Sequence, residues 1–249
     1  MRKPTREFQT IQHYIQSGAK LHYYGSGEGV HLFVDILARN PLHGFEAPDF
    51  YLASDKVFYI IEHFEFSSYR GTRKGDSYRQ EEARIQRKAD KIIPSEEVTV
   101  VHDVIRGESS YSNYMNNVKS TFEAHYAHID EYVLNLKKAG VLRDQIIKVI
   151  FMIEDVSPLG CIAGGKNGWD PDSELITLAR SKEFLDLLDK NRNVDYVLAC
   201  SCYDSNYYTW FIDSNELDVY RANAVDYANM QFIPFEPHVI TAKIALKDQ

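Results

Sequence analysis

The segment Val57–Phe66 constrains the fold of this chain more than any other. It is an almost continuous run of β-branched and aromatic residues after the polar turn Ser54–Lys56, which predicts a strand buried on both faces of a sheet. Two acids, Glu62 and Glu65, nevertheless occur at its end. A buried carboxylate is costly unless it is paired, protonated or bound to a cation. The function of this segment therefore depends on what surrounds its acids.

A third acid, Asp49, precedes the strand by one short hairpin. Two adjacent strands of a hairpin can project Asp49 and Glu62 toward the same edge. Carboxylates that converge in this way hold hard cations such as Mg²⁺ or Mn²⁺. A cation held there can activate a water and neutralise charge on a phosphate, as hydrolysis of a phosphodiester requires. The three acids therefore predict a divalent-metal site.

The same acids could instead have a purely structural role. Acids at the end of a buried strand often pair with arginines that follow in the chain, and three are available here: Arg70, Arg73 and Arg79. A second predicted buried strand also ends in two acids, Glu154 and Asp155. That repetition favours the structural explanation slightly, but these acids could equally form a second wall of one cleft, because ligands gather at the carboxyl ends of strands in open α/β sheets. Both interpretations stay open.

Strands alternate with helices along the chain. The apolar periodicity predicts helices over 4–17, 30–39, 78–91, 111–139 and 173–189, and strands beside Pro48-Asp49 and over 57–66, 97–105, 145–156, 194–200 and 207–212. This alternation predicts an α/β fold with a mixed central sheet flanked by helices, in a single domain over 1–249. In the long helix, His125 and His128 lie three positions apart and could form half a metal site, although surface histidines are the commoner explanation.

The charge balance argues against a general nucleic-acid coating protein. The formal net charge is −8, from 28 basic and 36 acidic residues, whereas the affinity of such proteins comes mostly from neutralising phosphates. The basic residues are densest over 70–91, directly after the acidic strand, where a phosphate-facing surface would serve an enzyme. A solvated helix face with interspersed glutamates explains this segment equally well.

The cysteines and the apolar runs indicate the cellular setting. Cys161, Cys200 and Cys202 have neither the number of a disulfide framework nor the spacing of a zinc site. No apolar run is long enough for a signal peptide or a membrane span. We therefore expect a cytoplasmic protein that does not bind a membrane. A hydrolase built on Cys161 or Cys200 with one of the nine histidines is a weaker candidate, because no nucleophile motif accompanies them.

Pro48-Asp49 and the acid-ending apolar run Ile60-Ile61-Glu62 together resemble the PD-(D/E)xK nuclease superfamily. The resemblance covers about 20 residues directly. It implies a restriction-endonuclease-like core with a helix–strand–strand–strand–helix outline. That core would occupy about residues 1–105 plus the strands at 145–156 and 194–202.

The resemblance also implies a divalent-metal-dependent nuclease that acts on nucleic acid. Asp49 and Glu62 would be catalytic metal ligands, with the backbone carbonyl of His63 as a further ligand and Mg²⁺ or Mn²⁺ as the cofactor. Glu65 and the His63 side chain lie on the opposite face of a regular strand. A β-bulge would let Glu65 join the metal, and the imidazole of His63 could be a ligand or support one.

One position departs from the family pattern. The family places a lysine two residues after the acid, where this chain has Phe64. Lys74, in the basic connector, is the expected catalytic replacement, and Arg79 is the second choice. If neither reaches the acids, the chain is an inactive nuclease-like scaffold. Such a scaffold would bind a protein partner, or a second copy of itself, through its 17 tyrosines.

Overall fold

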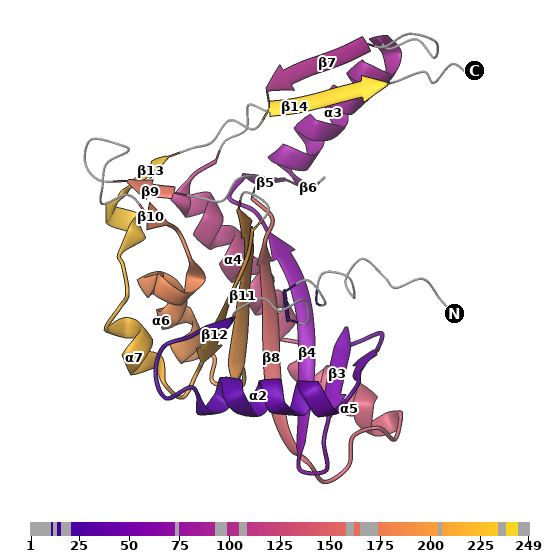
Figure 1. The fold of residues 1–249 in the computed structure, drawn as a ribbon, viewed down its shortest axis with the longest axis vertical. Helices are drawn as coiled ribbons and strands as arrows, with labels where there is room; N and C mark the ends of the chain where they lie inside the picture. The colour runs from indigo at the N-terminus through magenta and orange to yellow at the C-terminus, as the bar shows by residue number, and fades with distance from the viewer. Residues whose placement is uncertain are drawn as a thin grey trace.

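The computed structural model describes residues 11, 14–15, 21–72, 75–92, 99–104, 109–157, 162–164, 174–203, 206–233 and 238–243. Over these ranges the fold is α/β, with a seven-stranded mixed central sheet flanked by helices (Figure 1). The predicted fold class is therefore confirmed.

The central sheet has the strand order β1-β12-β11-β8-β4-β3-β2. Its strands are β1 (Leu21–His22), β2 (Leu42–Gly44), β3 (Phe50–Ala53), β4 (Val57–Phe66), β8 (Ile146–Asp155), β11 (Tyr196–Tyr203) and β12 (Asn206–Asp213). β4, β8 and β11 are parallel to one another, whereas β3 pairs antiparallel with β4 on one side and β12 pairs antiparallel with β11 on the other. The carboxyl ends of the three central strands therefore meet at one edge.

Helices cover both faces of this sheet (Figure 1). They are α2 (Glu28–Arg39), α4 (Tyr111–Tyr126), α5 (Ile129–Lys138), α6 (Lys182–Lys190) and α7 (Leu217–Arg221), with 3-10 turns η2 (Leu178–Arg180) and η3 (Tyr227–Asn229). The apolar side of α2 packs on one face, and α4, α5 and α6 pack on the other. Because both faces are covered, β4 and β8 are mostly apolar, with seven apolar residues of ten in each strand.

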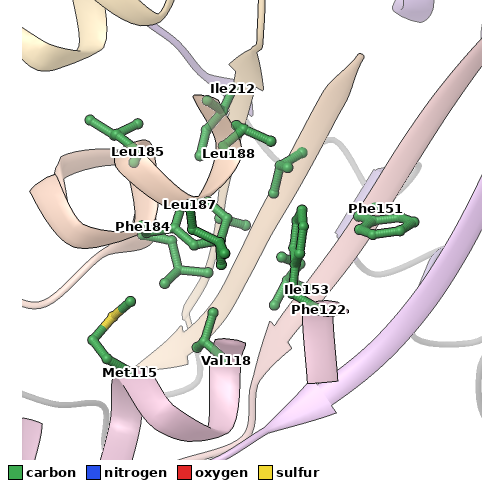
Figure 2. Close-up of a cluster of buried hydrophobic side chains, with 14 of the residues drawn as sticks. Met115, Val118, Phe122, Phe151, Ile153, Phe184, Leu185, Leu187, Leu188 and Ile212 are labelled. Carbon is green, nitrogen blue, oxygen red and sulfur yellow. The ribbon is translucent and has the colours of Figure 1, made fainter. Parts of the chain in front are cut away.

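The β4 side chains alternate between these two faces. Phe58 and Ile60 pack under α5, whereas Tyr59 and Ile61 pack under α2. Figure 2 shows the largest apolar cluster, in which α4 and α6 meet over the sheet. The labelled members are Met115, Val118, Phe122, Phe151, Ile153, Phe184, Leu185, Leu187, Leu188 and Ile212. These contacts anchor α4 against the strands that carry the acids.

A smaller unit projects from one end of the sheet (Figure 1). In it β7 (Thr99–Val104) pairs antiparallel with β14 (His238–Lys243), and α3 (Ser77–Ile92) packs against β14. The strand predicted over 97–105 forms, but it pairs with β14 and not with the central sheet. The remaining short strands are β5 (Gly71–Thr72), β6 (Gly75–Asp76), β9 (Ile162–Gly164), β10 (Glu174–Leu175) and β13 (Gln231–Ile233).

Two predicted helices differ from the observed ones. The helix predicted over 111–139 is two helices, because α4 ends at Tyr126 and α5 begins at Ile129, with a bond from His128 Nδ1 to Glu131 Oε2 across the new first turn. The helix predicted over 173–189 is confined to α6, whose start is fixed by the Ser181 side chain accepting a bond from the Phe184 N–H. The helix predicted over 4–17 lies mostly outside the described residues.

Candidate functional site

Asp49 lies immediately before β3, at the point where the hairpin with β4 opens. The loop before it closes on itself, with the Phe45 N–H donating to the Asp49 C=O at 2.7 Å. The β3–β4 register ends with Phe50 opposite Ile61. Continued by one residue, that register places Asp49 opposite Glu62, on the same face of the hairpin. The structure thus brings together Asp49 and Glu62, two of the three acids that the sequence selected.

Two hydrogen bonds join Asp49 to β4. The Asp49 N–H donates to Glu62 Oε2 at 3.2 Å, and the His63 N–H donates to Asp49 Oδ2 at 2.8 Å. Because the N–H and C=O of one strand residue point to the same neighbouring strand, the His63 carbonyl also faces the edge beside Asp49. Two carboxylates and one carbonyl therefore lie along one short stretch of strand edge.

The second oxygen of Glu62 contacts the helices above the sheet. Glu62 Oε1 lies 2.8 Å from His125 Nδ1 of α4 and accepts a 2.8 Å hydrogen bond from the Tyr132 hydroxyl of α5. Glu62 is only 6% exposed, so these donors replace the water that its carboxylate loses on folding. Burial and the hydrogen bond to Glu62 both raise the pKa of Tyr132 well above its ordinary value, so its hydroxyl stays protonated.

The residue at the motif lysine position touches the same histidine. The ring of Phe64 stacks on the imidazole of His125, with the ring centroids 4.6 Å apart and the planes 10° from parallel. We call Asp49, Glu62, Phe64, His125 and Tyr132 the Glu62 cluster. Its members come from the start of β3, from β4 and from the two helices α4 and α5.

The side chains of His63 and Glu65 do not belong to the Glu62 cluster. β4 pairs with β8 in unbroken register from Val57 to Phe66, so the strand has no bulge that could turn Glu65 toward Glu62. The His63 imidazole packs on the α2 side, where its Nε2 lies 3.1 Å from Glu154 Oε2. A metal at Asp49 and Glu62 could therefore use the His63 carbonyl but not the His63 or Glu65 side chains.

The two acids at the end of β8 lie on opposite faces of the sheet and away from the Glu62 cluster. Glu154 pairs with His63 and accepts a 3.3 Å hydrogen bond from the Tyr14 hydroxyl. Asp155 is buried on the other face, where it accepts a 2.8 Å bond from the Ser157 N–H. Burial raises the pKa of Asp155 to about 6, against the lowering effect of the Ser157 bonds. Glu154 and Asp155 therefore do not form, together with Glu62, the two walls of one cleft.

Of the two expected lysine replacements, Lys74 lies outside the described residues and Arg79 lies near the start of α3. Arg73, a possible structural partner of the acids, also lies outside the described residues. Four basic side chains farther along α3, those of Arg84, Arg87, Lys88 and Lys91, surround one open hollow. Arg84 is also paired with Glu81 of the same helix, so the basic surface includes acids, as the sequence indicated.

The sequence interpretation missed His125 and Tyr132 as neighbours of Glu62. It grouped His125 with His128, but His128 is exposed and pairs with Glu131. The available signal was the separation of His125 and Tyr132 by seven positions, because two turns of the single helix predicted over 111–139 would bring them to one face. That spacing identifies a shared face without saying which strand the face covers.

The oxygen atoms beside Asp49 fit a hard divalent cation. Mg²⁺ is commonly bound by one or two carboxylates together with oxygens of the substrate, and Glu62 Oε2 accepts a single backbone bond in this cluster. Among the residues that the structure describes, no group of three or more His, Cys, Asp or Glu side chains is arranged to hold a metal. Asp49, Glu62 and the His63 carbonyl supply oxygen ligands of the kind that could hold such a cation.

Comparison with protein-family models, with curated proteins and with solved structures found no match to this chain. No helix in the described ranges is long and apolar enough to cross a membrane.

Proposed function

We propose that this protein is a divalent-metal-dependent nuclease that hydrolyses phosphodiester bonds at Asp49 and Glu62. The observation that carries the proposal is the bonding between the two acids, in which the Asp49 N–H binds Glu62 Oε2 and the Asp49 carboxylate binds the His63 N–H. These bonds fix two carboxylates and a carbonyl before any ligand arrives, so the site needs little rearrangement to bind a cation.

The order of the elements supports this proposal. From α2 the chain passes through the antiparallel strands β2, β3 and β4, and α4 follows only after β5, β6, the helix α3 and the strand β7. With these four intervening elements set aside, the order resembles the helix–strand–strand–strand–helix outline that the PD-(D/E)xK resemblance implies. Asp49 lies immediately before the second of these strands, and Glu62 is the sixth of the ten residues of the third. The outline starts at α2 and includes β2, so it lies within residues 28–126.

Different residues of this chain have different roles in the proposed reaction. Asp49, Glu62 Oε2 and the His63 carbonyl would hold Mg²⁺ or Mn²⁺, which when bound supplies an activated water and neutralises charge on the phosphate. Asp49 is held by its bond from the His63 N–H, and Glu62 is held by His125 and Tyr132. The protein thus fixes both acids through neighbours that are themselves fixed in the sheet and in the helices.

Nucleic acid is the proposed substrate, and α3 is the described surface that favours it. Arg87 and Lys91 are exposed on this helix, in a chain whose formal net charge is −8. A local basic patch on an acidic protein directs a polyanion to one place rather than coating the whole surface. We propose a cytoplasmic setting, because Cys200 is a free, buried thiol.

Titration of Mn²⁺ into the protein, followed by a cleavage assay on DNA and RNA, tests the proposed function. Asp49→Asn keeps an oxygen that can accept the His63 N–H but removes the charge, so we expect a folded protein that loses both Mn²⁺ binding and cleavage. Asp55→Asn is the matched control, because Asp55 is an exposed acid on the turn at the other end of the same hairpin. Equal metal affinity in both variants would contradict the proposal.

An inactive scaffold that binds another protein is the second candidate. The observation that favours it is that Glu62 accepts bonds from three donors, as a buried structural acid does. This alternative predicts that wild-type protein neither binds Mn²⁺ at millimolar concentration nor cleaves nucleic acid, and that Asp49→Asn changes only stability.

A further inference from the structure

We infer that His125 takes the place in this site that the nuclease family gives to its motif lysine, and that Phe64 positions it there. This inference rests on the proposed nuclease function, because it assigns a role in that reaction. The motif lysine is missing from β4, where Phe64 stands two residues after Glu62. The structure shows that this same Phe64 is stacked on a histidine from α4.

Glu62 connects His125 to the proposed metal site. One carboxylate oxygen, Oε2, binds the Asp49 N–H at the strand edge, and the other, Oε1, binds His125 Nδ1 at 2.8 Å. The imidazole is therefore attached to the same carboxylate that would hold the cation. The inferred role requires the imidazole to reach a phosphate or a water bound beside that cation.

Three contacts fix the plane and the orientation of the imidazole. Phe64 covers one face of the ring, Glu62 binds its Nδ1, and the Tyr132 hydroxyl lies 3.5 Å from the same nitrogen. The lysine of the family extends from the strand itself. Here the strand supplies a flat support, and the polar group comes from the helix above it.

The hydrogen bond to Glu62 also determines which ring nitrogen of His125 can accept a hydrogen bond from another group. A carboxylate only accepts hydrogen bonds, and the Tyr132 hydroxyl donates its own proton to Glu62, so Nδ1 of His125 carries the proton in this pair. In the neutral ring Nε2 is then an acceptor. The His125 side chain is 28% exposed, whereas Glu62 beneath it is buried, so the imidazole separates the acid from solvent and can contact a substrate.

The role that follows is to orient the attacking water. His125 Nε2 accepts a hydrogen bond from that water, which directs the water oxygen toward the phosphorus atom. As the new O–P bond forms, the P–O bond to the leaving sugar oxygen breaks. The proton lost by the water and the proton gained by the leaving oxygen are exchanged with solvent, so the reaction balances as a simple hydrolysis.

The sharpest test is His125→Asn, because the asparagine amide can still donate to Glu62 Oε1 from near the position of Nδ1 but has nothing in place of Nε2. We expect this variant to stay folded with a slightly lower unfolding temperature, because the stacking on Phe64 is lost. It should keep its Mn²⁺ affinity and its KM and lose on the order of 10²-fold in kcat. His128→Asn is the matched control, since His128 is exposed and pairs with Glu131. It should change kcat by less than about twofold.

Placing a lysine at the motif position tests whether His125 performs the role that the lysine has in the family. Adding Phe64→Lys to His125→Asn should recover at least a tenth of the lost kcat, because the new lysine extends from the position where the family has it. Free imidazole added to His125→Ala provides the same test without a change in β4, and it should raise cleavage by that variant but not by wild type. The ¹⁵N chemical shifts of His125, measured without metal, should report a protonated Nδ1.

The outcomes separate this inference from the proposed function. Wild-type protein that does not cleave DNA or RNA overturns both. Wild-type protein that cleaves, with Asp49→Asn inactive and His125→Asn as active as wild type, overturns the role of His125 and leaves the nuclease in place. Loss of Mn²⁺ binding by His125→Asn overturns it as well, since His125 would then be a metal ligand. Reduced kcat with intact Mn²⁺ binding and rescue by either route establishes it.

Discussion

Glu62 is a buried acid whose two oxygens have different neighbours. Oε2 faces the start of β3, and Oε1 faces α4 and α5. An ionised carboxylate in a dry environment needs several donors, and here they are a backbone N–H, an imidazole and a phenol. Each donor comes from a different element, so the charge of Glu62 links the hairpin to both helices.

Tyr132→Phe tests how much the hydrogen bond from Tyr132 to Glu62 contributes to the stability of the fold. The variant leaves Glu62 Oε1 with one donor fewer inside the protein, so we expect the free energy of unfolding to fall by about 1.5–3 kcal/mol, as for hydrogen bonds to charged groups. Urea denaturation measures the change. Tyr126→Phe on α4 is the control, because Tyr126 is half-buried and stacks on Phe122. Equal losses in both variants would show that the bond to Glu62 contributes nothing.

Asp155 makes the free energy of unfolding depend on pH. Its pKa is raised to about 6 in the folded state, from an ordinary value of 3.8, chiefly by burial. The folded state therefore binds the proton more tightly, so the stabilisation is complete below about pH 4 and is lost as the pH rises through about 6. Asp155→Asn keeps an oxygen for the Ser157 N–H and cannot ionise.

We expect Asp155→Asn to raise the free energy of unfolding at pH 8 by roughly 1–3 kcal/mol relative to wild type, with a much smaller difference at pH 4. Urea denaturation of the two proteins at pH 4, 6 and 8 gives this difference directly, because all other titrating groups are shared. A difference that is constant over this range would show that Asp155 does not titrate there.

At this scale the sequence identified the acids but not their neighbours. Asp49 and Glu62 could be paired in advance because a hairpin has few registers that bury its apolar positions. His125 could not, because it follows Glu62 by 63 residues and the packing of α4 on β4 depends on the whole apolar cluster. Glu65 was correctly placed on the opposite face by alternation alone.

At the scale of elements, the division of one predicted helix into α4 and α5 matters most for the site. The apolar stripe runs through both helices without interruption, so periodicity predicts a single helix. His125 of α4 and Tyr132 of α5 contact the same oxygen of Glu62 from the two sides of this break. His128 precedes α5 without a side-chain capping bond, and an apolar pattern does not record its exposed pairing with Glu131.

The basic helix α3 provides a prediction at the same scale. Replacing both Arg87 and Lys91 by Ser should weaken binding of a short DNA or RNA duplex and reduce the slope of log affinity against log salt by about 1–2. Fluorescence anisotropy at several salt concentrations, without divalent metal, measures this independently of cleavage. Lys137→Ser with Lys138→Ser on α5 is the matched control, because both lysines are exposed on another helix. Equal slopes in both double variants would exclude α3 as the docking surface.

For the whole molecule, the central sheet separates two polar clusters. The Glu62 cluster lies under α4 and α5, whereas His63, Glu154 and Tyr14 lie on the α2 side. The adjacent β4 residues Glu62 and His63 thus belong to polar clusters on opposite faces of the sheet. The α/β class and the buried central strands could be predicted because they depend on local periodicity. The strand order and the pairing of β7 with β14 could not, because they depend on contacts between distant segments.

This separation predicts opposite effects for two acids close to His63. Glu154→Ala removes the partner of a buried imidazole, so we expect the free energy of unfolding to fall by about 1–3 kcal/mol while Mn²⁺ affinity stays within about twofold of wild type. Asp49→Asn should abolish Mn²⁺ binding and change stability far less, because its remaining oxygen still accepts the His63 N–H. Calorimetric titration and urea denaturation of both variants measure the two effects. Loss of Mn²⁺ binding in Glu154→Ala would mean that the two faces act as one site, with His63 as the residue that joins them.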